Sequence, residues 1–130
     1  MTDPISDMLT QIRNAIAVGK TEVILPYSHF KKRLGEILVK QGLLEELFTP
    51  SSRTKQQLLG LKLRYTNGKS VIGNLERVSR PGQRIYKKAD QLPHIRSGFG
   101  LTIISTSKGL YTDKEARKEH LGGEVICQIW

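Results

Sequence analysis

Three adjacent hydroxyl side chains and a run of cations could together bind a polyanion. The hydroxyls lie in the segment Ser105-Thr106-Ser107-Lys108-Gly109, which follows the apolar run Leu101 to Ile104. The cations lie in the segment Arg77 to Lys88, which holds five lysines and arginines, one tyrosine and no acid. A hydroxyl donates one hydrogen bond and accepts two from a short side chain, so it can reach a 2′-hydroxyl, a phosphate or a base edge in a shallow groove. These residue types predict nucleic-acid binding.

Each part of this pattern also has an ordinary structural explanation. Hydroxyls in a turn often cap nearby backbone amides, and for Ser105 to Ser107 this explanation weighs about as much as binding. The basic segment could equally be a solvated hairpin with Tyr86 packed in the core. In the binding interpretation, Tyr86 offers a planar face to a base or sugar. The cations that would then hold phosphates are Arg80, Arg84, Lys87 and Lys88.

Composition supports a polyanionic partner. The chain has 130 residues, with 21 lysines and arginines against 12 acids, a net charge of +9 and an isoelectric point near 9.9. Cys127 is the single cysteine, so no internal disulfide can form, and a reducing cytoplasm is the expected compartment. No apolar stretch approaches the roughly 18 residues needed to cross a bilayer, and acids stand at Asp3 and Asp7 where a signal peptide carries cations. We therefore expect no membrane partner.

No catalytic or metal-binding pattern accompanies these residues. Gly19-Lys20-Thr21 and Gly68-Lys69-Ser70 end like a phosphate-binding loop, but the glycine required five positions earlier is replaced by Asn14 and Leu63. The histidines stand far apart and form no familiar ligand spacing with cysteines or carboxylates. The sequence predicts a binding protein that is not an enzyme and has no cofactor.

Hydrophobic spacing and capping residues predict the elements of the first half. Asp3 and Pro4 begin a helix that Gly19 ends, and Ser28 caps a second helix that ends at Gly42. The strands predicted around these helices are Val23 to Leu25, Leu43 to Phe48, and Leu59 to Tyr65.

The second half is predicted to be rich in strands. Asn67-Gly68 is a strong hairpin signal, because both central residues of the favoured two-residue turn need positive φ. Thr112 and Glu115 form a capping box for a helix of about two turns. The other predicted elements are a strand Ser70 to Val78, a helical piece Asp90 to Ile95, a hinge Gly98 to Gly100, a strand Leu101 to Ile104, a helix stop at Gly122-Gly123 and a strand Glu124 to Trp130.

These elements predict an α+β fold of two small packed lobes. The N-terminal lobe, residues 1–70, has the order α-β-α-β-β, and the C-terminal lobe, residues 71–130, is strand-rich with short helices. The boundary is expected between Thr66 and Arg80.

The order of several segments resembles one known family over essentially the whole chain. These segments are Asp3 to Ala15, Ser79-Arg80-Pro81-Gly82, Arg84-Ile85-Tyr86, Ser105 to Gly109 and Gly122-Gly123-Glu124. Together they resemble bacterial small-subunit ribosomal protein number eight, of the universal ribosomal protein eight family.

The resemblance implies direct binding to the central domain of 16S ribosomal RNA, at a long hairpin with an irregular internal loop, and a role in small-subunit assembly beside neighbouring ribosomal proteins. It places the RNA against Ser105, Thr106, Ser107 and Tyr86, with phosphate contacts from Lys108, Arg80, Arg84, Lys87 and Lys88. Some members of the family also repress translation by binding their own messenger RNA through the same surface. That regulatory role is the alternative function.

Five further residues complete the candidate set. Glu124 could lie beside the hydroxyl segment, where its carboxylate would orient a serine or accept from a base amino group at the cost of repelling phosphate. Arg13, Lys31, Lys32 and Lys55 could reach a neighbouring RNA segment from the first half. For each of these four cations, a solvated helix face or loop edge is an equally good explanation.

Overall fold

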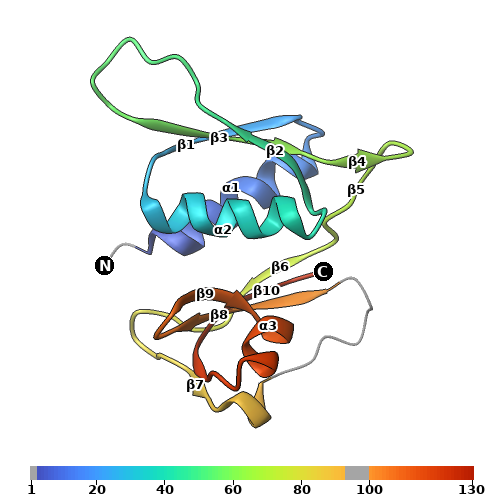
Figure 1. The fold of residues 1–130 in the computed structure, drawn as a ribbon. Coiled ribbons are helices and arrows are strands. Elements are labelled where there is room, and N and C mark those ends of the chain that lie inside the picture. The colour runs from blue at the N-terminus through green and yellow to red at the C-terminus, as the bar shows by residue number, and fades with distance from the viewer. Residues whose placement is uncertain (1–2, 93–99) are drawn as a thin grey trace. The chain divides into compact units, whose positions relative to one another are not determined.

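The computed structural model describes residues 3–92 and 100–130, which divide into two units (Figure 1). The N-terminal unit comprises residues 7–72, and the C-terminal unit comprises residues 73–130 together with the chain up to Ser6. Both units combine helices with antiparallel strands, which confirms the predicted α+β class. No helix in the described ranges is long and apolar enough to span a membrane.

The N-terminal unit packs two helices on one face of a three-stranded antiparallel sheet (Figure 1). The sheet has the order β1-β3-β2, with Leu25 opposite Leu59 and Leu47 opposite Leu61. A Cβ on Gly35 would lie 2.8 Å from the Leu47 side chain, so this glycine allows α2 to pack closely on β2. The elements are α1 (Pro4–Ala17), β1 (Glu22–Pro26), α2 (His29–Lys40), β2 (Leu44–Phe48), β3 (Leu58–Leu63), β4 (Tyr65–Thr66) and β5 (Lys69–Ser70). Fully buried side chains include Met8, Leu9, Ile12, Leu25, Leu34, Leu38, Leu44 and Leu61.

The predicted caps of α1 and α2 and the predicted turn at Asn67-Gly68 are confirmed. The Asp3 carboxylate accepts hydrogen bonds from the backbone N–H groups of Ile5 and Ser6 at 3.2 and 3.3 Å. The Ser28 hydroxyl accepts from the Lys31 N–H at 3.1 Å. Asn67-Gly68 has φ values of +53° and +79°, as the hairpin turn between β4 and β5 requires.

The predicted strand from Ser70 to Val78 is wrong as one continuous strand. Only β5 and β6 (Leu75–Arg77) are strands in this stretch. Between them, the N–H groups of Gly73 and Asn74 both donate to the Trp130 carbonyl, at 2.6 and 2.7 Å. Two donors that converge on one acceptor cannot continue a regular ladder, so the chain bends there.

The C-terminal unit places β10 at the centre of an antiparallel sheet. The order is β6-β10-β8-β9. The strand β7 pairs with the same edge of β10 as β6 does, but at the opposite end of β10. Leu92, Ile104, Ala116 and Val125 form a buried cluster between the sheet and its helices. Besides β6, the elements are β7 (Tyr86–Lys87), the 3₁₀ helix η1 (Ala89–Gln91), β8 (Leu101–Thr106), β9 (Gly109–Thr112), α3 (Asp113–Lys118) and β10 (Gly123–Ile129).

The predictions for this unit are confirmed only in part. The helical piece is the single turn η1, and the remainder of that prediction, from residue 93, lies outside the described residues, as do Gly98 and Phe99 of the predicted hinge. The strand β9 was not predicted. The capping box is confirmed, because the Thr112 hydroxyl accepts from the Glu115 N–H at 3.2 Å and the Glu115 carboxylate accepts from the Thr112 N–H at 3.1 Å.

Removing the capping hydroxyl should destabilise the protein. We expect Thr112→Ala to lower the free energy of unfolding by about 1 to 2 kcal/mol, because the first turn of α3 loses a hydrogen-bond acceptor. Urea denaturation of Thr112→Ser is the control, since serine keeps the hydroxyl and should retain most of the stability. Equal midpoints for the two variants would contradict a capping role.

Candidate nucleic-acid interface

The predicted hydroxyl loop is the end of a strand and a two-residue turn. Ser105 and Thr106 are the last residues of β8, and they pair with Leu110 and Gly109 of β9. The prediction that the strand ends at Ile104 is therefore wrong, because β9 supplies a pairing partner for two more residues. The turn contains only Ser107 and Lys108, and Gly109 follows with φ at +117°.

The hydroxyls of this hairpin differ in what they already bind. The Thr106 hydroxyl donates to the Gly109 carbonyl at 2.8 Å and accepts from the Lys108 N–H at 3.1 Å. The ordinary explanation, turn chemistry, thus holds for Thr106. Within residues 3–92 and 100–130, no group forms a hydrogen bond with the side chains of Ser105 or Ser107, and Ser107 is exposed. Two of the three hydroxyls are available to a ligand.

Three strands place an aromatic ring and a hydroxyl in one row. On β10, Glu124 is paired with Tyr86 of β7 on one side and with Ser105 of β8 on the other. Directly opposed residues of neighbouring strands point to the same face of a sheet. Their neighbours Val125 and Ile104 point to the other face, into the buried cluster that includes α3. Tyr86 is 67 % exposed, so the alternative in which it packs in the core is wrong.

Two glycines allow these strands to approach. A Cβ on Gly122 would lie 2.5 Å from the Lys87 carbonyl oxygen and 2.9 Å from the Lys88 Cα. A Cβ on Gly123 would collide with the Ser105 carbonyl oxygen. Backbone atoms cannot move aside as a flexible side chain can, so a side chain at either position would separate β10 from its neighbours.

Glu124 is held by hydrogen bonds from two residues. Its carboxylate accepts from the Ser79 hydroxyl at 2.6 Å and from the Arg84 guanidinium at 3.0 Å. Ser79 is fully buried, and its oxygen also accepts from the Ile85 N–H at 3.0 Å. Burial raises the pKa of Glu124, but the hydrogen bonds from Ser79 and Arg84 outweigh it, so the pKa lies below its ordinary value. The serine that Glu124 orients is Ser79, which is not among the residues predicted for the site.

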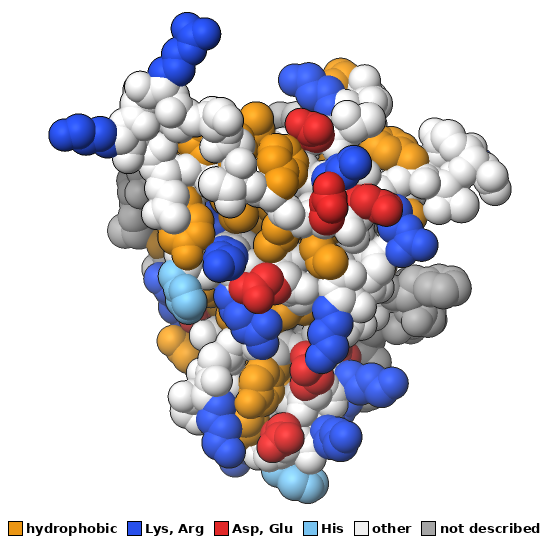
Figure 2. All heavy atoms as spheres, turned by 45° about the horizontal axis from the view of Figure 1, so that its top comes forward, with side chains coloured by type: hydrophobic (Ala, Val, Ile, Leu, Met, Phe, Trp, Pro, Cys, Tyr) orange, Lys and Arg blue, Asp and Glu red, His pale blue; other side chains and the backbone are white. Residues whose placement is uncertain are grey.

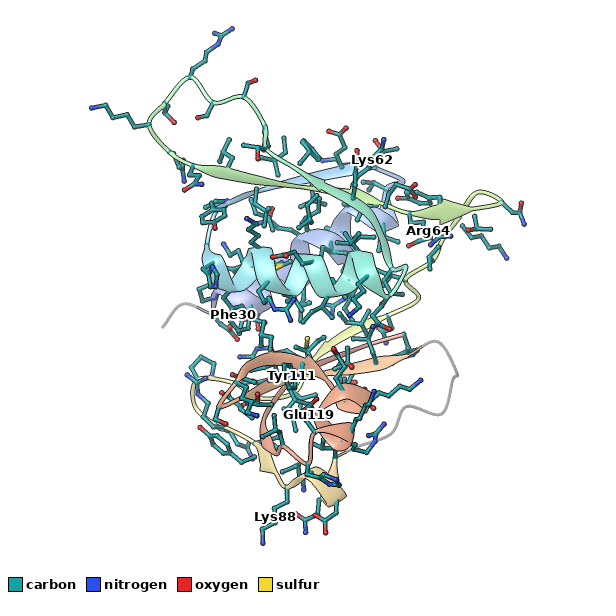
Figure 3. The ribbon with its side chains drawn as sticks, in the orientation of Figure 1. Phe30, Lys62, Arg64, Lys88, Tyr111 and Glu119 are labelled. Carbon is teal, nitrogen blue, oxygen red and sulfur yellow. The ribbon has the colours of Figure 1, made fainter. Side chains whose placement is uncertain are left out.

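The basic segment divides into structural and free cations. Arg77 is buried, and its guanidinium donates to Asp3 at 3.2 Å and to the Ile126 carbonyl at 2.6 Å. Arg84 is half-exposed but paired with Glu124. The side chains without a hydrogen bond or ion pair to any described residue are Arg80, Lys87, Lys88 and, from the hairpin turn, Lys108. Lys88 points away from the body of the unit (Figure 3).

The four candidate cations of the N-terminal unit come from separate elements. Arg13 is exposed on α1, and Lys55 is exposed in the connection between β2 and β3. Lys31 and Lys32 lie in the first turns of α2, where the Lys31 ammonium donates to the Pro26 carbonyl at 3.2 Å. On the face shown in Figure 2, lysines and arginines alternate with acids and do not form one continuous patch. RNA contact by these four residues stays a prediction.

The described residues offer no metal site or reactive thiol. No group of three or more histidine, cysteine, aspartate or glutamate side chains in the described ranges could hold a metal ion. Cys127 is buried, and burial raises the pKa of its thiol to about 12, so the thiolate is scarce at neutral pH.

Comparisons with known proteins give a single family. The model of the family described as Ribosomal protein S8 matches residues 3–130. Three curated relatives carry the name small ribosomal subunit protein uS8. The protein of Kosmotoga olearia is 50 % identical over 133 residues, covering 99 % of this chain and 98 % of the relative. Those of Persephonella marina and Thermodesulfovibrio yellowstonii are each 47 % identical, covering 100 % of this chain and 99 % of the relative.

The hydrogen bonds to Glu124 should make stability depend on pH in the acid range. Because the pKa of the folded carboxyl lies below its ordinary value of 4.5, its contribution is complete above pH 4.5 and is lost as the pH falls through the lower, folded value. We expect Glu124→Gln to lower the free energy of unfolding by about 1 to 2 kcal/mol at pH 7, and to lower it by less at pH 3. Urea denaturation at both pH values measures this.

Glu76→Gln is the matched control, since Glu76 is an exposed acid on the neighbouring strand β6. Its effect on stability should be small at both pH values. A pH-independent loss in Glu124→Gln would mean that packing, and not the carboxylate charge, is responsible.

Proposed function

The chain belongs to the ribosomal protein S8 family, and on this premise we propose that its C-terminal unit binds structured ribosomal RNA through the face that carries Tyr86, Ser105 and Ser107. It is a ribosomal protein of the small subunit and not an enzyme. The RNA we propose is a hairpin with an irregular internal loop in the central domain of 16S ribosomal RNA. Binding there would support assembly of the small subunit in the cytoplasm, beside neighbouring ribosomal proteins.

The observation that carries this proposal is the row formed by Tyr86, Glu124 and Ser105 across β7, β10 and β8. It places an exposed aromatic ring and a free hydroxyl on one sheet face, next to the turn that carries Ser107. Double-stranded RNA presents a wide, shallow minor groove lined with 2′-hydroxyls, which short hydroxyl side chains can reach. An exposed ring can stack on an unpaired base of an internal loop.

The cations around this row suit the phosphate backbone. Lys87 and Lys88 continue the chain from Tyr86, and Lys108 follows Ser107. Phosphate contacts of this kind position a protein on RNA without reading its sequence. Glu124 does not leave an uncompensated negative charge in the row, because Arg84 is paired with it at 3.0 Å.

The alternative function is repression of translation through a hairpin in the protein's own messenger RNA. The free groups on the face are hydroxyls, cations and one ring, which respond to shape more than to base sequence. A messenger hairpin that presents the same shape would therefore meet the same contacts. Gel shifts with the leader of the protein's own transcript test this role separately.

Removing the exposed turn hydroxyl should weaken RNA binding. We expect Ser107→Ala to lower affinity for the hairpin protected in footprints of small-subunit RNA by about 5- to 150-fold, because RNA groups buried at the interface would be left without a hydrogen-bond partner. Filter binding measures the change. Thr66→Ala is the control, since Thr66 is an exposed hydroxyl residue beside the two-residue turn of the other unit. Unchanged affinity for Ser107→Ala would exclude this hydroxyl from the interface.

Removing two lysines should change the salt dependence of binding. We expect the double variant Lys87→Ala, Lys88→Ala to reduce the slope of log affinity against log salt by roughly one unit for each phosphate that the protein no longer neutralises. The matched control is Lys114→Ala, Lys118→Ala, which removes the same charge from exposed positions on α3. Equal slopes for the two double variants would show that Lys87 and Lys88 act only through net charge.

A further inference from the structure

We propose that the free edge of β1 binds an extended segment of another small-subunit protein, which pairs with β1 as an added strand. The segment would carry an aliphatic side chain for a hollow beside β1 and a lysine or arginine opposite Glu22. The N-terminal unit would then bind protein while the C-terminal unit binds RNA. This inference needs only membership of the small subunit and does not depend on the RNA interface.

The exposed apolar side chains of the protein indicate this edge. In the described ranges only three large apolar side chains are exposed, and one of them, Tyr86, belongs to the proposed RNA interface. The other two are Val18, which is 71 % exposed, and Ile24, which is 49 % exposed. Both line a single hollow of about 460 Å³. Apolar side chains that gather at one place on a surface often mark a binding site.

The hollow lies between α1 and the sheet edge. One wall is formed by residues at helical spacing on α1 and directly after it: Gln11, Asn14, Ala15 and Val18. The other wall is formed by the chain that leads into β1 and by the first residues of β1: Lys20, Glu22, Val23 and Ile24. Successive side chains of a strand point to opposite faces, so every second side chain of an added strand would point toward α1.

The backbone of β1 is bonded to β3 at every second residue. Just before β1, the Thr21 carbonyl accepts from the Leu63 N–H at 2.8 Å. Hydrogen-bonded pairs alternate with non-bonded pairs along an antiparallel ladder. Counting from Thr21, the backbone groups of Val23 and Leu25 therefore face β3.

The residues between them direct their backbone groups to the free edge. Glu22 and Ile24 each present an N–H and a carbonyl there, while Pro26 has no N–H to offer. No strand in the part of the chain that the structure describes pairs with this edge. A row of unpaired backbone donors and acceptors is the surface on which an extended polypeptide adds as a strand. The edge therefore determines that the ligand is a polypeptide.

The charges at the edge also favour a polypeptide over RNA. Glu22 lies opposite Lys62 of β3, but the Lys62 ammonium is paired with Glu46 of β2 at 3.9 Å. Glu22 is exposed and forms no ion pair with any described residue. Lys20 is the one cation among the described residues that line the hollow, so phosphates meet no excess of positive charge there. A lysine or arginine opposite Glu22 on an added strand would complement the carboxylate.

The other edge of the sheet is less suited to an added strand. The pairing of β2 with β3 shifts its register between Leu44 and Glu46, and such an irregularity bends a strand and interrupts its ladder. The pairing of β1 with β3 has no shift from Glu22 to Pro26. The regular row of backbone groups that an incoming strand needs is therefore found on β1.

A crosslink in assembled small subunits tests the inference. Val18→Cys places a thiol at the hollow, to which a photoreactive reagent can be attached. Cys127 does not compete for the reagent, because it is buried and its pKa is raised to about 12. We expect the reagent to crosslink to one segment of one other small-subunit protein. Ser51→Cys is the control, since Ser51 is exposed between β2 and β3 of the same unit, and it should not reach this segment.

A synthetic peptide of the crosslinked segment tests the backbone pairing. We expect the peptide to slow hydrogen exchange at the N–H groups of Glu22 and Ile24, and to leave those of Val23 and Leu25 unchanged because they already bond to β3. Ile24→Pro should bind the peptide about 5- to 150-fold more weakly than Ile24→Ala, because proline also removes the edge N–H. An edge strand tolerates proline where the N–H faces solvent, so both variants should remain folded. If Ile24→Pro does not fold, the exchange pattern of the unchanged protein still decides the question.

The opposing outcomes are distinct. If the reagent on Val18→Cys reacts only with RNA, with a second copy of the chain or with nothing, the edge does not bind another small-subunit protein. If the peptide slows exchange at none of the four amides, or at all four equally, no strand is added to β1. RNA affinity of Ser107→Ala is measured without the peptide, so failure of the RNA interface and failure of this inference are distinguishable.

Discussion

The close approach of β10 to its two neighbours is the constraint on which the candidate interface depends. Gly122 and Gly123 bring the backbone of β10 against Lys87 on one side and Ser105 on the other. Adjacent strands lie about 4.8 Å apart, so two such spacings put Tyr86 and Ser105 about 10 Å from each other across Glu124. Widening either spacing would separate the ring from the hydroxyl. A backbone packing requirement thus fixes the distance between the groups that would meet the ligand.

A buried polar network positions the basic segment next to this row. Ser79 is fully buried and links the Glu124 carboxylate to the Ile85 N–H, which adds a side-chain link to the backbone bonds that Ser79 and Ile85 form with Val125 of β10. The Arg84 guanidinium completes the network from the exposed side. A buried polar group destabilises the fold unless it forms hydrogen bonds, so every member of this network needs a partner. These hydrogen bonds also fix the path of the backbone that leads into Tyr86. Glu124 therefore acts through the geometry of the hairpin, and its carboxylate is already engaged within the protein.

Local signals in the sequence predicted the elements well where the structure depends on neighbouring residues. Capping by Ser28 and by Thr112 with Glu115 is decided within one turn, and the turn at Asn67-Gly68 within two residues. The strand predictions that were wrong depend on contacts between residues far apart in the sequence. The strand predicted through Gly73 is broken by a carbonyl at Trp130, and β8 extends past Ile104 because β9 pairs with it. Neither partner is visible in the apolar pattern of the segment itself. The candidate site shows the same division, because the bond between Ser79 and Glu124 joins residues 45 positions apart and no local spacing reveals it.

Two contributions to RNA binding can be distinguished: the long-range attraction of the net charge and the short-range contacts of uncharged side chains. Arg77 belongs to the run of five cations, yet its guanidinium is buried against Asp3, 74 positions away, so only the folded chain shows which charges remain free. The net charge of +9 attracts any polyanion at long range and is screened by salt. The groups that can distinguish one RNA shape from another are few and uncharged: the ring of Tyr86 and the hydroxyls of Ser105 and Ser107. Their spacing is set by buried backbone contacts, which salt does not weaken. Selectivity should therefore persist at salt concentrations that reduce overall affinity, because salt screens the attraction between charges but does not change the spacing of the ring and the hydroxyls.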